Sequence, residues 1–148
     1  MILKAFTKKT VLTITDSREP LVSFNDKSGL ISFTTGLTAK IKMTSADRVI
    51  LLQDEYRPRD WYLKVIPPDH NDKEEFRDAF KLRQGKSFLA FNASPICRTI
   101  IKSLDLEPGL TYRMTVSPEL AAGGIGYPII TASAHTFSNR KSKNKSKP

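Results

Sequence analysis

RVILLQDEYRPRDWYLKVI, residues 48–66, is the stretch that decides the fold class. Its two ends, Arg48 to Gln53 and Trp61 to Ile66, are rich in β-branched, aliphatic and aromatic residues, which are typical of strands. A polar loop with one proline separates them, and Pro67-Pro68 ends the second segment, because proline cannot donate to a strand ladder. The stretch predicts two strands joined by a loop.

Further strands and two helices are expected on both sides of this hairpin. The predicted strands are Thr10–Thr15, Leu21–Phe24, Leu30–Phe33, Phe76–Arg83, Ser87–Phe91, Leu110–Val116 and Pro128–Ala132. A short helix is expected over Thr35–Met43 after a Thr34-Thr35 cap. A clearer helix begins with Ser94 as N-cap and Pro95 at the first helical position, and reaches Leu104.

These elements predict an α+β fold, with one or more antiparallel β-sheets of about 8–9 strands and two helices. Gly29–Phe33 before the first helix is echoed by Ser87–Phe91 before the second, about sixty residues later, with a strand after each helix. This suggests an internal pseudo-repeat, with halves near 1–47 plus 110–134 and 48–107. We expect one compact β-rich domain over 1–138 and a disordered basic tail over 139–148.

The charge is strongly basic, with 24 Lys and Arg against 15 Asp and Glu, a net +9. Residues 139–148 carry five of these cations and no acid. A basic balance raises affinity for any polyanion, because phosphate contacts release counterions. Nucleic acid is therefore the partner class that charge favours.

Signals for catalysis and for metal or cofactor binding are weak. Gly85-Lys86-Ser87 ends like a phosphate-binding loop, but Phe80 stands where that loop needs its first glycine. His70, Cys97 and His135 lack partners at ligand spacing, and the acidic pairs fall in hydrophilic loops. We expect a non-enzymatic protein without metal or cofactor.

The strand and helix order carries two family resemblances. Four strands followed by one helix, over Arg48 to Leu104, resemble the fold shared by the plant Whirly proteins, Pur-alpha and positive cofactor four. That resemblance implies single-stranded nucleic acid lying on curved sheets, often across a dimer. Gly29–Phe33, a short helix and Ser45–Leu51 are similar to the strand, helix, strand pattern of AbrB-type swapped-hairpin barrels, which implies duplex DNA binding.

A single strand bound without strict sequence choice needs cations for phosphates and exposed aromatic rings for bases. Strand alternation places Tyr62 and Lys64 on one face and Trp61 on the other, which we expect to be the core. The same alternation predicts that Arg77, Lys81 and Arg83 form an outward basic stripe along one strand. The candidate binding residues are Arg57, Arg59, Tyr62, Lys64, Arg77, Lys81, Arg83, Lys86, Phe88, Arg140, Lys141 and Lys143.

Other interpretations stay open. The stripe is equally consistent with a solvated strand face or an edge protected by charge. The protein is then a structural or assembly subunit with incidental nucleic-acid affinity, or an AbrB-like regulator that binds duplex DNA. A single cysteine and the absence of a signal peptide or long apolar run favour a cytoplasmic protein without a membrane partner. A homodimer or higher homo-oligomer is also compatible with the sequence.

Overall fold

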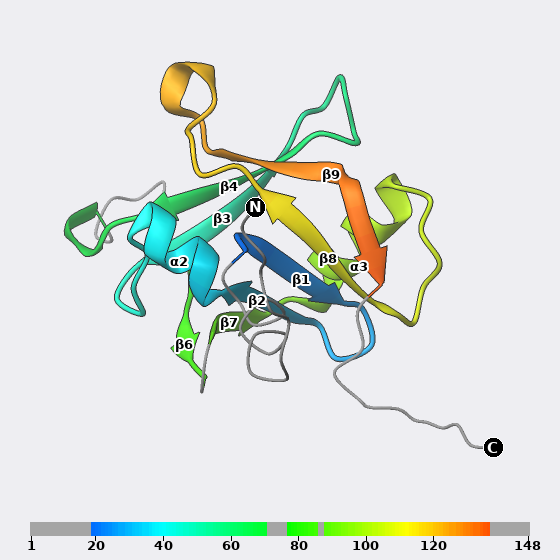
Figure 1. Cartoon of the computed structure of the whole chain (residues 1–148), viewed down its shortest axis with the longest axis horizontal. Coiled ribbons are helices and arrows are strands. Elements are labelled where there is room, and N and C mark those ends of the chain that lie inside the picture. The colour runs from blue at the N-terminus through cyan, green and yellow to red at the C-terminus, as the bar shows by residue number, and fades with distance from the viewer. Residues whose placement is uncertain (1–18, 71–76, 86–87, 137–148) are drawn as a thin grey trace, which may run out of the picture.

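A computed structural model describes residues 19–70, 77–85 and 88–136 (Figure 1). The predicted strand Thr10–Thr15, Phe76, Lys86 and the basic tail lie outside these residues. The strands are β1 (Leu21–Asn25), β2 (Leu30–Thr34), β3 (Arg48–Gln53), β4 (Trp61–Ile66), β5 (Phe80–Lys81), β6 (Arg83–Gln84), β7 (Phe88–Asn92), β8 (Thr111–Val116) and β9 (Tyr127–Thr136). The helices are α2 (Thr35–Ile41) and α3 (Ser94–Ser103), with 3₁₀ turns η1 (Pro68–His70) and η3 (Ala122–Gly124).

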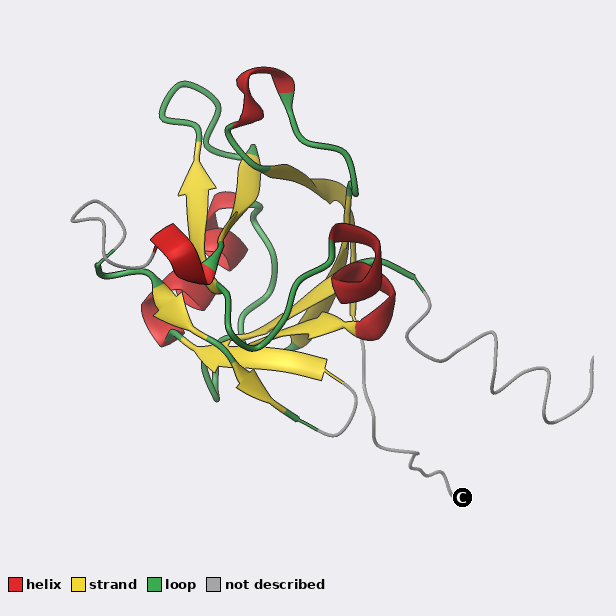
Figure 2. Cartoon of the chain, turned by 90° about the vertical axis from the view of Figure 1, so that its left-hand side faces the viewer, coloured by secondary structure: helices red, strands yellow, loops and turns green. Residues whose placement is uncertain are grey.

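The nine strands of the described residues form one nearly closed antiparallel sheet, which confirms the predicted α+β class. Their order is β5-β3-β4-β9-β8-β1-β2-β7-β6. The two edge strands, β5 and β6, are separated in the chain by Leu82 alone. Residues 80 and 81 pair with β3, and residues 83 and 84 pair with β7. Figure 2 shows that the strands form a strongly curved sheet. The sheet therefore closes on itself almost as a barrel.

This closing segment differs from its prediction. One strand was expected over Phe76–Arg83, but residues 77 and 78 form a turn, and pairing begins at Phe80. Lys81 and Arg83 still point outward while Leu82 is buried, as alternation predicts. The chain changes its strand partner at Leu82, a tertiary event that a local pattern does not contain.

The strand order repeats itself within the sheet. Residues 21–66 supply two strands, a helix and two strands, and residues 80–136 supply the same series when β5 and β6 count as one strand. When β1 is exchanged with the combined β5/β6 strand, β2 with β7, β3 with β8 and β4 with β9, every pair of neighbouring strands in the sheet becomes another pair of neighbours. This repeat divides the chain after β4, not at the residue 48 and 107 boundaries expected from the sequence.

The inner face of the sheet and both helices share one core. The largest fully buried side chains include Phe24, Phe33 and Leu63, and Leu37 of α2 and Ile100 of α3 belong to the same cluster. Figure 1 shows α2 and α3 on opposite sides of the strands. The helices thus cover the core at two separate places.

The two helices start differently. The side chain of Thr34 accepts a hydrogen bond from the Leu37 N–H, as predicted for a cap. The prediction for α3 is wrong by one residue, because Ala93 is the N-cap and Ser94 is already helical. Ala93 takes that place since its N–H donates to the Gly29 carbonyl at 2.8 Å, which fixes the backbone before the helix. Pro95 remains within the first turn.

Candidate nucleic-acid interface

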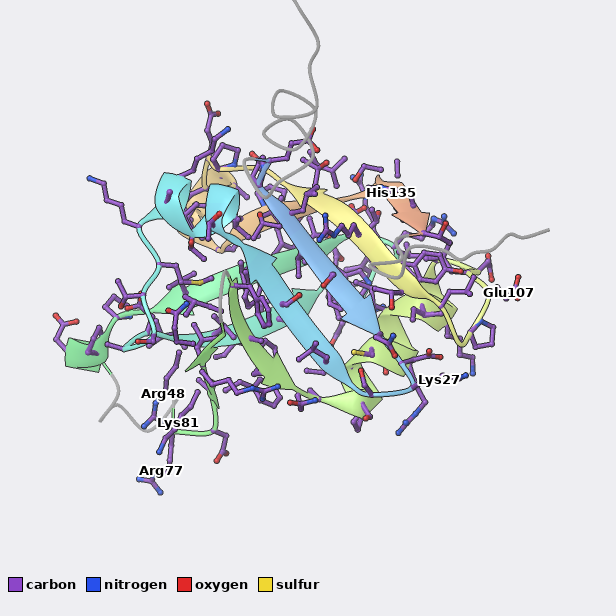
Figure 3. All side chains as sticks on the ribbon, turned by 60° about the horizontal axis from the view of Figure 1, so that its bottom comes forward. Lys27, Arg48, Arg77, Lys81, Glu107 and His135 are labelled. Atoms are coloured by element: carbon purple, nitrogen blue, oxygen red, sulfur yellow. The ribbon has the colours of Figure 1, made fainter. Side chains whose placement is uncertain are left out.

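Three cations meet where β5 lies against β3. Arg48 and Lys81 are directly paired residues on the two strands, and the Arg48 Nη1 donates a hydrogen bond to the Arg77 carbonyl at 3.3 Å. Figure 3 shows the three side chains gathered at one border of the molecule and pointing away from it. The turn before β5, β5 itself and the first residue of β3 therefore place three positive groups together.

The outward face extends this group in both directions. On β4, Tyr62 and Lys64 share a face with Arg48, because they pair with Leu52 and Ile50 of β3 while Leu51 and Val49 point inward. On the other side Arg83 follows Lys81 after the buried Leu82 and is exposed. We call this set the cationic strip: Arg48, Lys64, Arg77, Lys81 and Arg83.

The strip is poor in ion pairs within the described part of the chain. Among the described residues, Arg48, Arg77, Lys81 and Arg83 form no ion pair with an acidic side chain, and Arg83 donates instead to the neutral Asn92 amide at 2.6 Å. The described residues hold 13 of the 24 basic and 11 of the 15 acidic residues, so their net charge is only +2. Five of those 13 cations lie in the strip, which makes it a local concentration of charge.

Arg57 and Arg59 do not join the strip. Both lie in the loop between β3 and β4, at the far end of β3 from Lys81. Asp54 and Glu55 lie in the same loop, and Arg59 lies 3.7 Å from the Asp105 carboxylate. Six residues of strand separate the two groups, roughly 20 Å. Of the other predicted residues, Lys86, Arg140, Lys141 and Lys143 lie outside the described residues.

The aromatic residues divide between core and surface. Trp61 is buried and its indole N–H donates to Ser103 Oγ at 3.0 Å, which confirms the prediction that its side is core. Phe80 and Phe91 are stacked with ring centroids 4.7 Å apart. Tyr62 is half-buried on the outer face, beside Leu52 and Pro128, and is the aromatic side chain nearest in register to Lys64. Phe88 is half-buried at the start of β7.

Arg48 is the member of the strip that sequence reasoning missed. The alternation of β3 contained the signal, since Val49 and Leu51 on one face leave Arg48 on the other. Its proximity to Lys81, however, depends on the pairing of β3 with β5 across 32 intervening residues. No local pattern reports that pairing.

Two other titratable groups are shifted by burial. Desolvation raises the pKa of the Cys97 thiol to about 11, in keeping with its complete burial in the core. Desolvation also lowers the pKa of Arg113, and the nearby Glu19 carboxylate opposes that change. Arg113 is partly buried among strands β1, β8 and β9 and does not belong to the strip.

The described part of the chain holds neither a metal-binding cluster nor a membrane-spanning helix. No three His, Cys, Asp or Glu side chains there converge in a way that could hold a metal ion. None of the helices in that part has the length and apolar character needed to cross a membrane.

Comparisons with protein-family models, with curated proteins and with solved structures found no match. The two family resemblances therefore remain hypotheses, and an inference of function rests on the geometry above.

Proposed function

We propose that this protein binds single-stranded nucleic acid across the outer face of β4, β3, β5 and β6. The observation that carries the proposal is the cationic strip, in which side chains from separate chain segments converge while four of them lack an acidic partner among the described residues. Exposed cations that gather on one face raise the local concentration of polyanions, and Lys and Arg side chains of this kind supply the phosphate contacts of nucleic-acid complexes.

The five cations of the strip suffice to contact a short run of phosphates. Five phosphate contacts to a single strand give a salt slope of about −3.5 in log affinity against log salt. The basic tail adds five cations outside the described residues. We expect the tail to increase affinity without determining where the nucleic-acid strand lies on the protein. We expect the strip to determine that position.

Tyr62 favours an unpaired strand over a duplex. Its ring lies on the same face as Lys64, with Leu52 and Pro128 beside it in register. A half-exposed ring in apolar surroundings offers a surface on which a base can stack, and such stacking contributes about 1–3 kcal/mol per base. In a duplex the base faces are already stacked on each other and cannot use the ring.

Binding of the purified chain to matched single-stranded DNA, single-stranded RNA and duplex DNA, across several salt concentrations, tests the proposal. We expect the single strands to bind more tightly than the duplex and affinity to fall steeply with salt. Tighter duplex binding would favour the AbrB-like alternative, and no binding at low salt would refute nucleic-acid binding altogether.

A second candidate function is that of an assembly subunit, which exposed aliphatic residues favour. Leu120 and Ile125 in the loop between β8 and β9, and Ile130 on β9, are 56%, 46% and 44% exposed. Clusters of exposed apolar side chains often mark protein contacts. Sedimentation of the chain with and without a single strand separates the two, because an assembly subunit self-associates in the absence of nucleic acid.

A further inference from the structure

A cavity of about 350 Å³ lies beside the cationic strip, between the end of α2, the end of β4 and the loop that joins β8 to β9. Figure 1 shows these three segments on the same side of the sheet. Small-molecule sites range from about 300 to 1,000 Å³, so the cavity has room for one small ligand. Its lining includes Lys42, Asp47, Val65, Leu120, Gly126 and Tyr127.

The cavity and the strip share residues. Lys64 borders the cavity too, although its side chain points to the outer face while Val65 and Tyr127 of the cavity wall face the core. Asp47 of the cavity directly precedes Arg48 of the strip. A polymer whose phosphates follow the strip therefore passes the cavity. Lys42, the C-cap residue of α2, is exposed and adds an ammonium group to the cavity lining.

The cavity is also lined by a largely buried hydrogen-bond acceptor, the Asp47 carboxylate. Asp47 is only 8% exposed, and its Oδ2 accepts from the Thr44 N–H at 2.8 Å and from the Thr44 hydroxyl at 3.5 Å. No described residue donates to Oδ1. A carboxylate carries about four acceptor positions, so Oδ1 can take an N–H from a ligand in the cavity.

The remaining walls are apolar or aromatic. Val65, Leu120 and Tyr127 come from β4, the loop between β8 and β9, and β9 itself. Gly126 lets β9 begin very close to β4, since an added Cβ would lie 2.9 Å from the Leu63 carbonyl oxygen. A partly apolar cavity with one buried acceptor and one lysine matches a nucleotide. The base has apolar faces and N–H groups at its edge, and the phosphate is an anion.

We propose that this cavity holds one unpaired nucleotide of the bound strand, with the base against Leu120 and Tyr127, an N–H of its edge on Asp47 Oδ1, and the phosphate beside Lys42. The proposal rests on the proposed function and deepens it. Turning a base out of a single strand costs less than turning it out of a duplex, so the cavity adds a second reason for single-strand preference.

The test uses the full chain with two soluble probes, a set of nucleoside 5′-monophosphates and ribose 5-phosphate. Both carry the same phosphate, and only the nucleotides carry a base. We expect saturable nucleotide binding, measured by NMR titration, with shifts at Leu120 and Tyr127 and with at least tenfold weaker binding of ribose 5-phosphate. Equal binding of the two probes, or no saturable binding of any nucleotide, overturns the proposal.

Two variants localise the effect. Leu120→Asp places a carboxylate in the cavity lining, and Ile130→Asp is its matched control, because Ile130 is similarly exposed but does not line the cavity. We expect Leu120→Asp to weaken mononucleotide binding tenfold or more and Ile130→Asp to leave it within twofold. Equal effects of both variants would place the nucleotide elsewhere.

Binding of a twelve-nucleotide single strand, measured beside these titrations, distinguishes the two proposals. If the oligonucleotide binds in a salt-dependent way while no nucleotide enters the cavity, the cavity inference fails and the proposed function stands. If neither probe binds, both fail. Asp47→Asn, which replaces an acceptor by an amide, is expected to change the order of affinity among the four bases without abolishing oligonucleotide binding.

Discussion

Removing two charges from the middle of the strip should change the salt dependence of binding by a calculable amount. Lys81→Gln with Arg83→Gln leaves three of the five strip cations. Both side chains are exposed and neither forms an ion pair among the described residues, so we expect the fold to persist. At about 0.7 of a unit per contact, the slope for a single strand becomes shallower by about 1.4.

The magnitude is large enough to measure directly. For the strip alone, a rise from about 50 to 200 mM salt weakens a five-contact complex roughly 130-fold and a three-contact complex roughly 20-fold. The difference in slope does not depend on what the tail contributes, because the tail is the same in both proteins. Fluorescence anisotropy with a labelled single strand at four or more salt concentrations gives both slopes.

The control carries the same change in charge elsewhere. Lys27→Gln with Lys102→Gln removes two exposed cations outside the strip, and Figure 3 shows Lys27 far from Arg48 and Lys81. We expect this variant to keep the slope of the wild type to within a few tenths. If both double variants lose the same slope, binding follows net charge and the strip is not an interface.

The remaining predictions concern the tail, the stacking residue, the core and the buried thiol. Deletion of residues 139–148 should lower single-strand affinity yet leave salt-dependent binding, whereas complete loss would assign all binding to the tail. Tyr62→Ala should cost about 1–3 kcal/mol of single-strand binding free energy. Its control, Tyr56→Ala, changes an exposed loop position outside the strip and should cost less. A larger loss for Tyr56→Ala than for Tyr62→Ala would remove Tyr62 from the interface. Phe91→Ala should lower the free energy of unfolding by about 3–5 kcal/mol in urea denaturation, because Phe91 stacks on both Phe33 and Phe80; a loss under about 1 kcal/mol would contradict this closely packed junction. The pKa of Cys97 is raised in the folded state, so the stabilisation that the protonated thiol contributes is complete below pH 9 and is lost as pH rises from 9 towards 11. Relative to Cys97→Ala, the free energy of unfolding of the wild type should fall by on the order of 2 kcal/mol over that range. Parallel pH profiles of the two proteins would show that the thiol is not desolvated.

The hairpin of β3 and β4 was predictable because its signals are local. Arg48–Gln53 and Trp61–Ile66 have the predicted bounds in the structure, since apolar alternation and a proline stop act within a few residues. The start of α3 was missed by one residue. Ser94 has the side chain of an N-cap, but a hydrogen bond from Ala93 to Gly29 sets the boundary one residue earlier.

The closure of the sheet and the composition of the strip were not predictable in this way. Leu82 separates two short strands that bond to opposite edges of the sheet, and each half is only two residues long, too short for a periodic signal. The same closure brings Lys81 to Arg48. Alternation alone correctly gave an outward Lys81, Arg83 and Lys64, but grouped Arg57 and Arg59 with them because it measures distance along the chain and not across the sheet.

Chemical-shift mapping of the full chain with a short single-stranded oligonucleotide tests the central claim most directly. A strand held by the strip should shift the backbone amides of Arg48, Lys64, Lys81 and Arg83 progressively and leave those of Lys27 and His135 unchanged, since the latter two lie away from the strip (Figure 3). Saturable binding that shifts Lys27 and His135 while β3, β5 and β6 stay unperturbed would contradict it.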